Sequence, residues 1–161
     1  MADSRVLYSA QEDVFVLKFI GDIRFTLCGA IDNVIHRAFE KNYQSFVVDL
    51  TETTGIDSTA LGVLAQIAVH TRKSNLPKPS LLIADAYMKH VLEGVCFHQV
   101  FNMLKQDDPK QQSFKEIHPV EISERDMVDK VLTAHKRLMS LSKENEEQFK
   151  DVVQALEQNQ S

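Results

Sequence analysis

Residues 46–50 (Phe-Val-Val-Asp-Leu) form a nearly unbroken apolar run between two stretches of helical periodicity. In residues 26–41 and again in residues 58–74, apolar side chains recur every three or four positions, which indicates an amphipathic helix. A short apolar run of this kind suits a central strand that is covered on both faces. A strand between two such helices favours an α/β sheet in which parallel strands are joined by right-handed crossovers.

The alternation of strands and helices continues on both sides of this unit. Residues 5–9 and 13–20 are rich in β-branched and aromatic residues and predict an opening hairpin, which adds an antiparallel edge. Residues 80–84 predict a second buried strand, residues 87–96 a third helix and residues 100–104 a short last strand. The predicted fold is therefore a mixed sheet of four to five strands with helices packed against it.

A polar segment then separates this unit from the rest of the chain. Residues 106–112 contain Pro109 and no apolar residue, which is typical of a linker. With 161 residues, the chain is sized for one domain and an appendage. We predict a domain over residues 1–108, a linker over residues 109–122 and a helical C-terminal extension over residues 123–161.

The C-terminal extension has no glycine or proline between Met127 and Gln158, and it carries two apolar stripes. Polar residues around Asn145 interrupt the pattern, so the sequence fits either two helices or one long helix with a polar middle. The stripes either pack back on the domain or form a coiled-coil-like surface for a homodimer or another partner. The sequence leaves both alternatives open.

Charge and composition exclude several classes of function. The net charge of −5, without a basic stripe, argues against nucleic-acid binding. No apolar run approaches the roughly 20 residues of a membrane span, and no secretory signal precedes the first strand, so we expect a cytoplasmic protein without membrane contact. Cys28 and Cys96 lack metal-type or redox-type spacing, and the six histidines are scattered, so no metal or cofactor is predicted.

Ser58 lies at the predicted start of the second helix, between Asp57 and Thr59. Serine is a favoured N-cap residue because its oxygen accepts a hydrogen bond from the first turn, so capping is the simplest interpretation. We expect this hydroxyl on the surface, at the positive end of the helix dipole. A phosphate there would be tolerated electrostatically and would change the local charge.

Asp22, Asp49 and Asp57 form an acidic set near one end of the predicted sheet, and Asp49 sits at the end of a strand, where ligand sites of open α/β sheets collect. No nucleophile–base pair or phosphate-binding loop accompanies them. We therefore do not expect an enzyme. Catalysis by this acidic cluster is the third hypothesis, after the two binding functions described below.

Residues 49–62, which end in Ile-Asp-Ser-Thr-Ala-Leu-Gly, resemble the phosphoacceptor motif of STAS domains and specifically of anti-sigma factor antagonists. Gly21-Asp22-Ile23 resembles the glycine-plus-acid turn of that family, and the resemblance extends over about 100 residues. It implies a STAS fold in which a partner kinase phosphorylates Ser58, or less readily Thr59, and a phosphatase reverses this. The predicted partner-binding residues are Asp22, Thr54, Gly55, Ile56, Asp57, Ser58, Thr59 and Leu61.

The resemblance implies a phosphorylation-controlled partner switch. The unphosphorylated protein would bind an anti-sigma factor that is also a serine kinase and so free the sigma factor, and phosphorylation would end that binding. STAS domains also serve as accessory subunits that dock on the ATPase of lipid-transport ABC complexes. In that alternative Ser58 is only a cap.

Overall fold

The computed structural model describes residues 4–106 and 114–158. The first part of the predicted linker, residues 109–113, therefore lies outside the described residues. The strands are β1 (Arg5–Gln11), β2 (Val14–Ile23), β3 (Ser45–Ile56), β4 (Ser80–Ile83), β5 (Asn102–Lys105) and β6 (Lys115–Ile117). The helices are the 3-10 turn η1 (Phe25–Leu27), α1 (Cys28–Phe39), α2 (Ser58–Lys73), α3 (Ala86–Glu93), α4 (Phe97–Val100), α5 (Glu124–Met139) and α6 (Lys143–Gln158).

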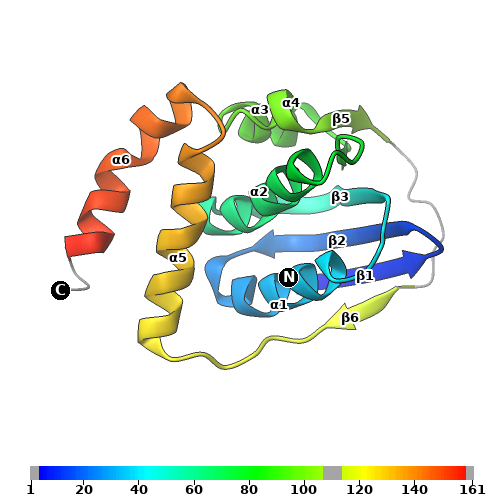
Figure 1. Ribbon diagram of the computed structural model, residues 1–161, viewed down its shortest axis with the longest axis horizontal. Coiled ribbons are helices and arrows are strands. Elements are labelled where there is room, and N and C mark those ends of the chain that lie inside the picture. Colours follow the sequence, from blue (N-terminus) through cyan, green and yellow to red (C-terminus); the bar gives the residue numbers. More distant parts are fainter. Residues whose placement is uncertain (1–3, 107–113, 159–161) are drawn as a thin grey trace.

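The strands form one mixed sheet in the order β5-β4-β3-β2-β1-β6 (Figure 1). Strands β2 to β5 are parallel neighbours, whereas β1 is antiparallel to both β2 and β6. The predicted mixed α/β fold with an antiparallel edge is thus confirmed. The sheet has one strand more than predicted, because residues 115–117, which we assigned to the linker, pair with β1.

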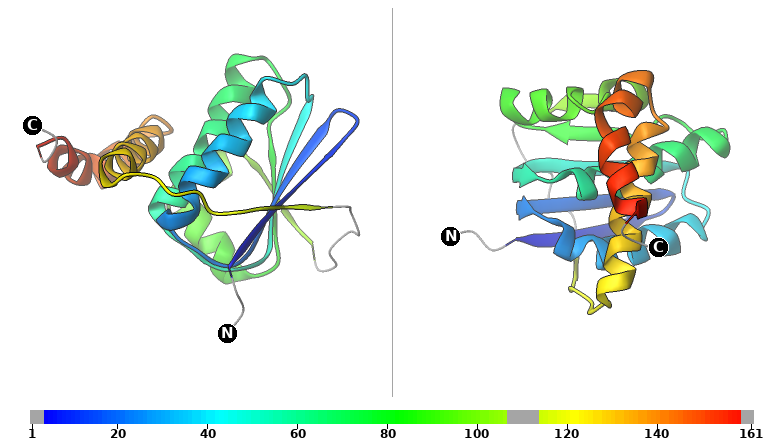
Figure 2. Two further views of the ribbon diagram at one scale, coloured as in Figure 1. Left: turned by 90° about the horizontal axis from the view of Figure 1, so that it is seen from below. Right: turned by 90° about the vertical axis from the view of Figure 1, so that its left-hand side faces the viewer.

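Helices α1 and α2 lie beside each other against one face of the sheet (Figure 2). Because side chains alternate along a strand, every second residue of β2 and β3 points toward these helices. The side chains between sheet and helices are almost fully buried, and they include Leu17, Phe19, Val48, Leu50, Ile31, Ile35, Leu64 and Ile67. This core fixes where β3 ends and α2 begins.

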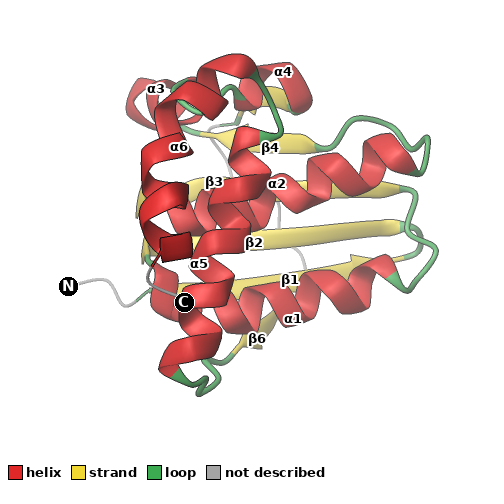
Figure 3. Cartoon of the chain, turned by 60° about the vertical axis from the view of Figure 1, so that its left-hand side comes forward, coloured by secondary structure: helices red, strands yellow, loops and turns green. Residues whose placement is uncertain are grey.

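The C-terminal extension forms two helices that pack back on the domain. Helix α5 crosses the end of the sheet at which β2 and β3 finish, and it packs against α2 (Figures 1 and 3). Helix α6 lies on the outer side of α5. Of the two alternatives left open by the sequence, the structure therefore shows packing on the domain.

Asn145, which we expected to interrupt the apolar stripes, is buried at the start of α6. Its Nδ2 donates hydrogen bonds of 2.8 Å to the carbonyl oxygens of Val95 and Leu138. Ser142 accepts a hydrogen bond from the Asn145 backbone N–H and so caps the helix. The polar break thus ends one helix, starts the next and ties both to the turn after α3.

The assignment of the core predicts that replacing a buried phenylalanine lowers the free energy of unfolding much more than replacing an exposed one. Phe19→Ala removes a ring that is 0% exposed and should lower the free energy of unfolding by about 3–5 kcal/mol. Phe25→Ala, at a ring that is 44% exposed, should cost less than about 1 kcal/mol. Urea unfolding followed by circular dichroism measures both, and similar losses would contradict the assignment of the core.

Candidate functional site

Asp57 caps helix α2 and joins two elements. Its Oδ1 accepts a hydrogen bond from the Ala60 backbone N–H at 2.9 Å, and its Oδ2 accepts one from the Phe25 N–H at 2.7 Å. Ser58 is therefore the first residue of α2 rather than its cap. The interpretation of Ser58 as a simple cap is wrong, because the preceding aspartate performs that task.

The Ser58 hydroxyl contacts helix α5 instead. Its Oγ lies 2.8 Å from Nε2 of His135, a side chain that is almost fully buried. The other ring nitrogen, Nδ1, lies 2.7 Å from the Val131 carbonyl oxygen, which can only accept, so Nδ1 carries the hydrogen. In the neutral ring, Nε2 then accepts the hydroxyl hydrogen of Ser58. The expectation of an uncovered surface serine is wrong in this conformation, in which Ser58 is partly buried.

One turn further along the same face of α2, Gly62 allows the two helices to meet at very short range. A Cβ at Gly62 would lie 2.6 Å from the Cβ of Ala134 and closer still to the Ala134 carbonyl oxygen. No side chain fits there, so the glycine is required for this contact. The motif contains Gly62, but its role became visible only with α5 in place.

Asp32 of α1 forms a second connection to α5. Its buried carboxylate accepts a hydrogen bond of 2.6 Å from Gln66 Nε2 of α2 and forms an ion pair with Lys130 of α5. Burial alone would raise the pKa of Asp32, but the hydrogen bonds from Lys130 and Gln66 and the Lys130 charge outweigh it, so the pKa is lowered. Asp32 was not predicted as a site residue. Its position next to the apolar residues of the predicted helix 26–41 is the sequence feature that could have identified it.

The predicted partner-binding residues differ in accessibility. Asp22 and Thr54 are exposed, whereas Thr59 and Leu61 are buried and belong to the interior of the domain in this conformation. Gly55 leaves room for the Asp22 carboxylate, which a Cβ would displace, and Asp22 also accepts a 2.8 Å hydrogen bond from Arg24 Nε. The exposed part of this surface is thus formed by Asp22 at the end of β2 and Thr54 near the end of β3.

Asp49 does not join the other two acids of the predicted cluster. It lies in the middle of β3, where its Oδ1 accepts hydrogen bonds from the Thr51 N–H and hydroxyl, and its Oδ2 is 3.9 Å from Lys18 Nζ. Within residues 4–106 and 114–158, no group of three or more His, Cys, Asp or Glu side chains is placed to hold a metal ion.

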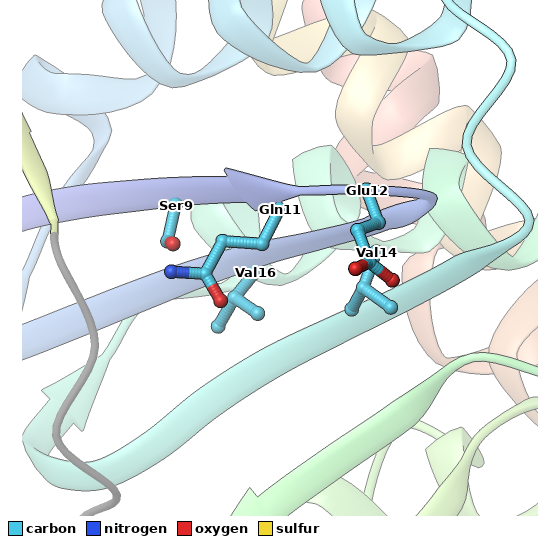
Figure 4. Close-up of a pocket in the computed structure, with 5 residues that line it drawn as sticks. All are labelled: Ser9, Gln11, Glu12, Val14 and Val16. Atoms are coloured by element: carbon cyan, nitrogen blue, oxygen red, sulfur yellow. The ribbon is translucent and has the colours of Figure 1, made fainter.

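A surface cavity of about 470 Å³ lies at the other end of the sheet (Figure 4). It is lined by Ser9, Gln11, Glu12, Val14 and Val16. Val14 pairs with Ser45 at the start of β3, whereas Ser58 follows the end of β3. The cavity therefore does not form part of the Ser58 site.

The fold and site define an α/β domain in which an aspartate-capped helix begins with a serine, just after the carboxyl end of an inner strand of a mixed sheet. Residues 6–77 match the family model of the STAS domain, so this part of the chain is a STAS domain. No curated protein matches the chain in sequence. None of the helices in the described parts of the chain has the length and apolar character needed to cross a membrane.

The solved structures that are similar to the chain include the following three. A candidate anti-sigma factor antagonist from Thermotoga maritima has a TM-score of 0.55 and 18% identity, covering 62% of this chain and 85% of the other. An anti-sigma factor antagonist from Mycobacterium paratuberculosis has a TM-score of 0.52 and 17% identity, with 63% and 86% covered. Unphosphorylated SpoIIAA, also an anti-sigma factor antagonist, has a TM-score of 0.51 and 14% identity, with 79% and 96% covered. At these identities the likeness shows the fold alone.

Because Asp57 accepts two backbone hydrogen bonds, we predict that replacing it lowers the free energy of unfolding more than replacing another N-cap aspartate does. Asp85 caps α3 in the same way, through one hydrogen bond of 2.9 Å from the Met88 N–H, and serves as the matched reference. Asp85→Ala should lower the free energy of unfolding by about 1 kcal/mol. Asp57→Ala should cost about 1 kcal/mol more, because the Phe25 N–H also loses its acceptor. Equal losses in chemical denaturation would show that the contact with Phe25 contributes nothing.

Proposed function

We propose that the protein is an anti-sigma factor antagonist that is switched by phosphorylation of Ser58. While Ser58 is unmodified, it binds an anti-sigma factor that is also a serine kinase, and the sigma factor is freed. A serine phosphatase resets the modified protein. The protein itself catalyses no reaction, and only its kinase uses ATP. The proposed switch operates in the cytoplasm. The STAS domain and the fold shared with anti-sigma factor antagonists support this proposal.

The observation that carries the proposal is the position of Ser58 as the first residue of a 16-residue helix whose cap is supplied by Asp57. Its hydroxyl is not needed to cap the helix, so a modification of Ser58 would leave the cap intact. A phosphoserine carries a charge of about −1.5 to −2, which the N-terminal N–H groups and dipole of α2 favour. The STAS domain should therefore tolerate the phosphate.

A binding partner would experience the same phosphate differently. It would meet a dianion beside Asp57, on a surface to which Asp22 also contributes negative charge. A loss of about 3–4 kcal/mol of binding free energy corresponds to a two- to three-decade rise in the dissociation constant. Such a change is large enough to release one partner and free another.

The second candidate function is that of an accessory subunit on the ATPase of a lipid-transport ABC complex. One observation favours it: the Ser58 hydroxyl is already used in a hydrogen bond to His135, as a purely structural serine would be. Co-purification of a permease and its ATPase with the tagged protein, without a kinase, would select this function.

The proposal predicts a phosphate on Ser58 in the native cell. Intact-mass measurement should show a fraction of the protein with one added phosphoryl group, and tandem mass spectrometry should place it on Ser58. Ser58→Ala should abolish the added mass. A phosphate found only on another residue, or none under any growth condition, would contradict the switch.

The proposal also predicts opposite effects of two substitutions on binding. The probe is the anti-sigma factor ATPase captured by the Ser58→Ala protein, which should bind with about the affinity of the unmodified chain. Ser58→Asp should weaken binding at least tenfold, because it places a negative charge beside Asp57. Ser74→Asp, at the exposed opposite end of α2, is the control and should change the dissociation constant less than twofold. Undiminished binding by Ser58→Asp in calorimetry would refute the mechanism.

A further inference from the structure

Helix α5 covers the face of α2 that a kinase would need. Ser58 Oγ is hydrogen-bonded to the buried His135 ring, and one turn further Gly62 lies against the backbone of α5 at Ala134. Phosphoryl transfer requires the attacking hydroxyl in line with the γ-phosphate of ATP, inside the active site of the kinase. A hydroxyl held between two packed helices does not meet this requirement.

The phosphorylated protein is also incompatible with this arrangement. Oγ and Nε2 of His135 are 2.8 Å apart, a hydrogen-bond distance that leaves no room for a phosphorus atom and its oxygens between them. A phosphoryl group on Ser58 replaces the hydroxyl hydrogen that Nε2 accepts, and along this hydrogen bond it would need the space that the imidazole ring fills. The observed conformation therefore belongs to the unmodified chain.

Helices α5 and α6 pack on each other and form a helical hairpin. Residues 118–123, which connect it to β6, are neither helix nor strand. Besides the Ser58 contact, the polar attachments of the hairpin include the Lys130–Asp32 ion pair and the hydrogen bonds from Asn145 Nδ2 to the Val95 carbonyl oxygen and from Gln148 Nε2 to that of Gly94.

Apolar side chains hold the hairpin as well, since Leu138 of α5 and Phe149 of α6 are buried in the main core. Opening would expose them to water, so the open form is a minor fraction of the protein. When only a fraction of the molecules can bind, the apparent affinity falls by that fraction.

We infer that the α5–α6 hairpin is a built-in competitor: it occupies the Ser58–Gly62 face of α2, and the kinase and anti-sigma partner reach Ser58 only after displacing it. The partner that takes its place presents a helix with a small residue opposite Gly62, because only such a helix can approach the bare backbone there. The identity of the displacing protein rests on the proposed function, whereas the cover over Ser58 is testable without it.

Thiol labelling in the full-length chain tests the cover. Ser58→Cys supplies the reactive thiol in a Cys96→Ser background, because Cys96 contacts a carboxylate of α6 and opening would uncover its thiol as well. Cys28 is buried, and burial raises its pKa to about 12. Ala134→Leu adds a side chain where none fits and should open the hairpin, whereas Thr133→Leu adds the same side chain at the exposed neighbouring position.

The rate of reaction with N-ethylmaleimide is compared at its high-pH limit, where the thiol introduced by Ser58→Cys is ionised in every variant and the rate reports access alone. We expect this thiol to react at least tenfold faster when Ser58→Cys is combined with Ala134→Leu than when it is alone or combined with Thr133→Leu. Rates within twofold of one another in all three proteins would overturn the inference.

A second pair of variants keeps the test valid if Ala134→Leu fails to fold by circular dichroism. Lys130→Glu replaces the ion pair with Asp32 by repulsion and should open the hairpin, whereas Arg125→Glu makes the same charge change at an exposed position in the first turn of α5. Equal labelling rates of the introduced thiol in these two backgrounds would again overturn the inference.

The phosphate on Ser58 separates this inference from the proposed function. In the native cell, with Ser58 intact, the phosphorylated fraction should be higher for Ala134→Leu than for Thr133→Leu. Faster labelling of the introduced thiol in the opened variant, without any phosphate on Ser58, would support the cover and refute the proposed switch. Phosphate on Ser58 with an equal fraction in both variants, and with equal labelling, would support the switch and refute the cover.

Discussion

The packing of α5 on α2 is the contact that determines the surroundings of Ser58, Gly62 and Asp32. It brings a histidine to the Ser58 hydroxyl and a lysine to Asp32, and it uses a glycine to bring two backbones together. Without α5, each of these groups would have different surroundings. Gly62 would be a weak point in α2, and Asp32 would be a buried charge paired only with Gln66 and His36. The C-terminal helices are therefore part of the site rather than an appendage beside it.

Asp57 and Ser58 divide two tasks that the sequence assigned to one residue. The aspartate satisfies the N–H groups at the start of α2 and in η1, so the turn before the helix is fixed independently of the serine. A change at Ser58 then alters the charge and the contacts of the surface without removing the cap. This separation is what a modification site requires, because the fold has to persist in both states.

Much of the fold followed from local patterns. Most strands and helices up to residue 105 were predictable because the apolar period changes from strand to helix and back. The separate helix α4 and the extension of β3 beyond Leu50 were not predicted. An extended piece around Ile117 was a possibility, but its pairing with β1 was not predictable from the local pattern. The Asp-Ser-Thr turn was also predictable, but its cover was not. His135 and Ser58 are 77 positions apart, and no local pattern relates a histidine on one amphipathic helix to a serine on another.

Strand β6 has a consequence for any competition at α2. Because β6 is hydrogen-bonded to β1, the six residues 118–123 would keep the hairpin tethered to the domain if it swung away. A short tether keeps an intramolecular ligand at an effective concentration on the order of millimolar. A competing protein at micromolar concentration would therefore need a far higher intrinsic affinity for α2 than α5 has, so the pairing of three β-strand residues with β1 would set the affinity that a competitor requires.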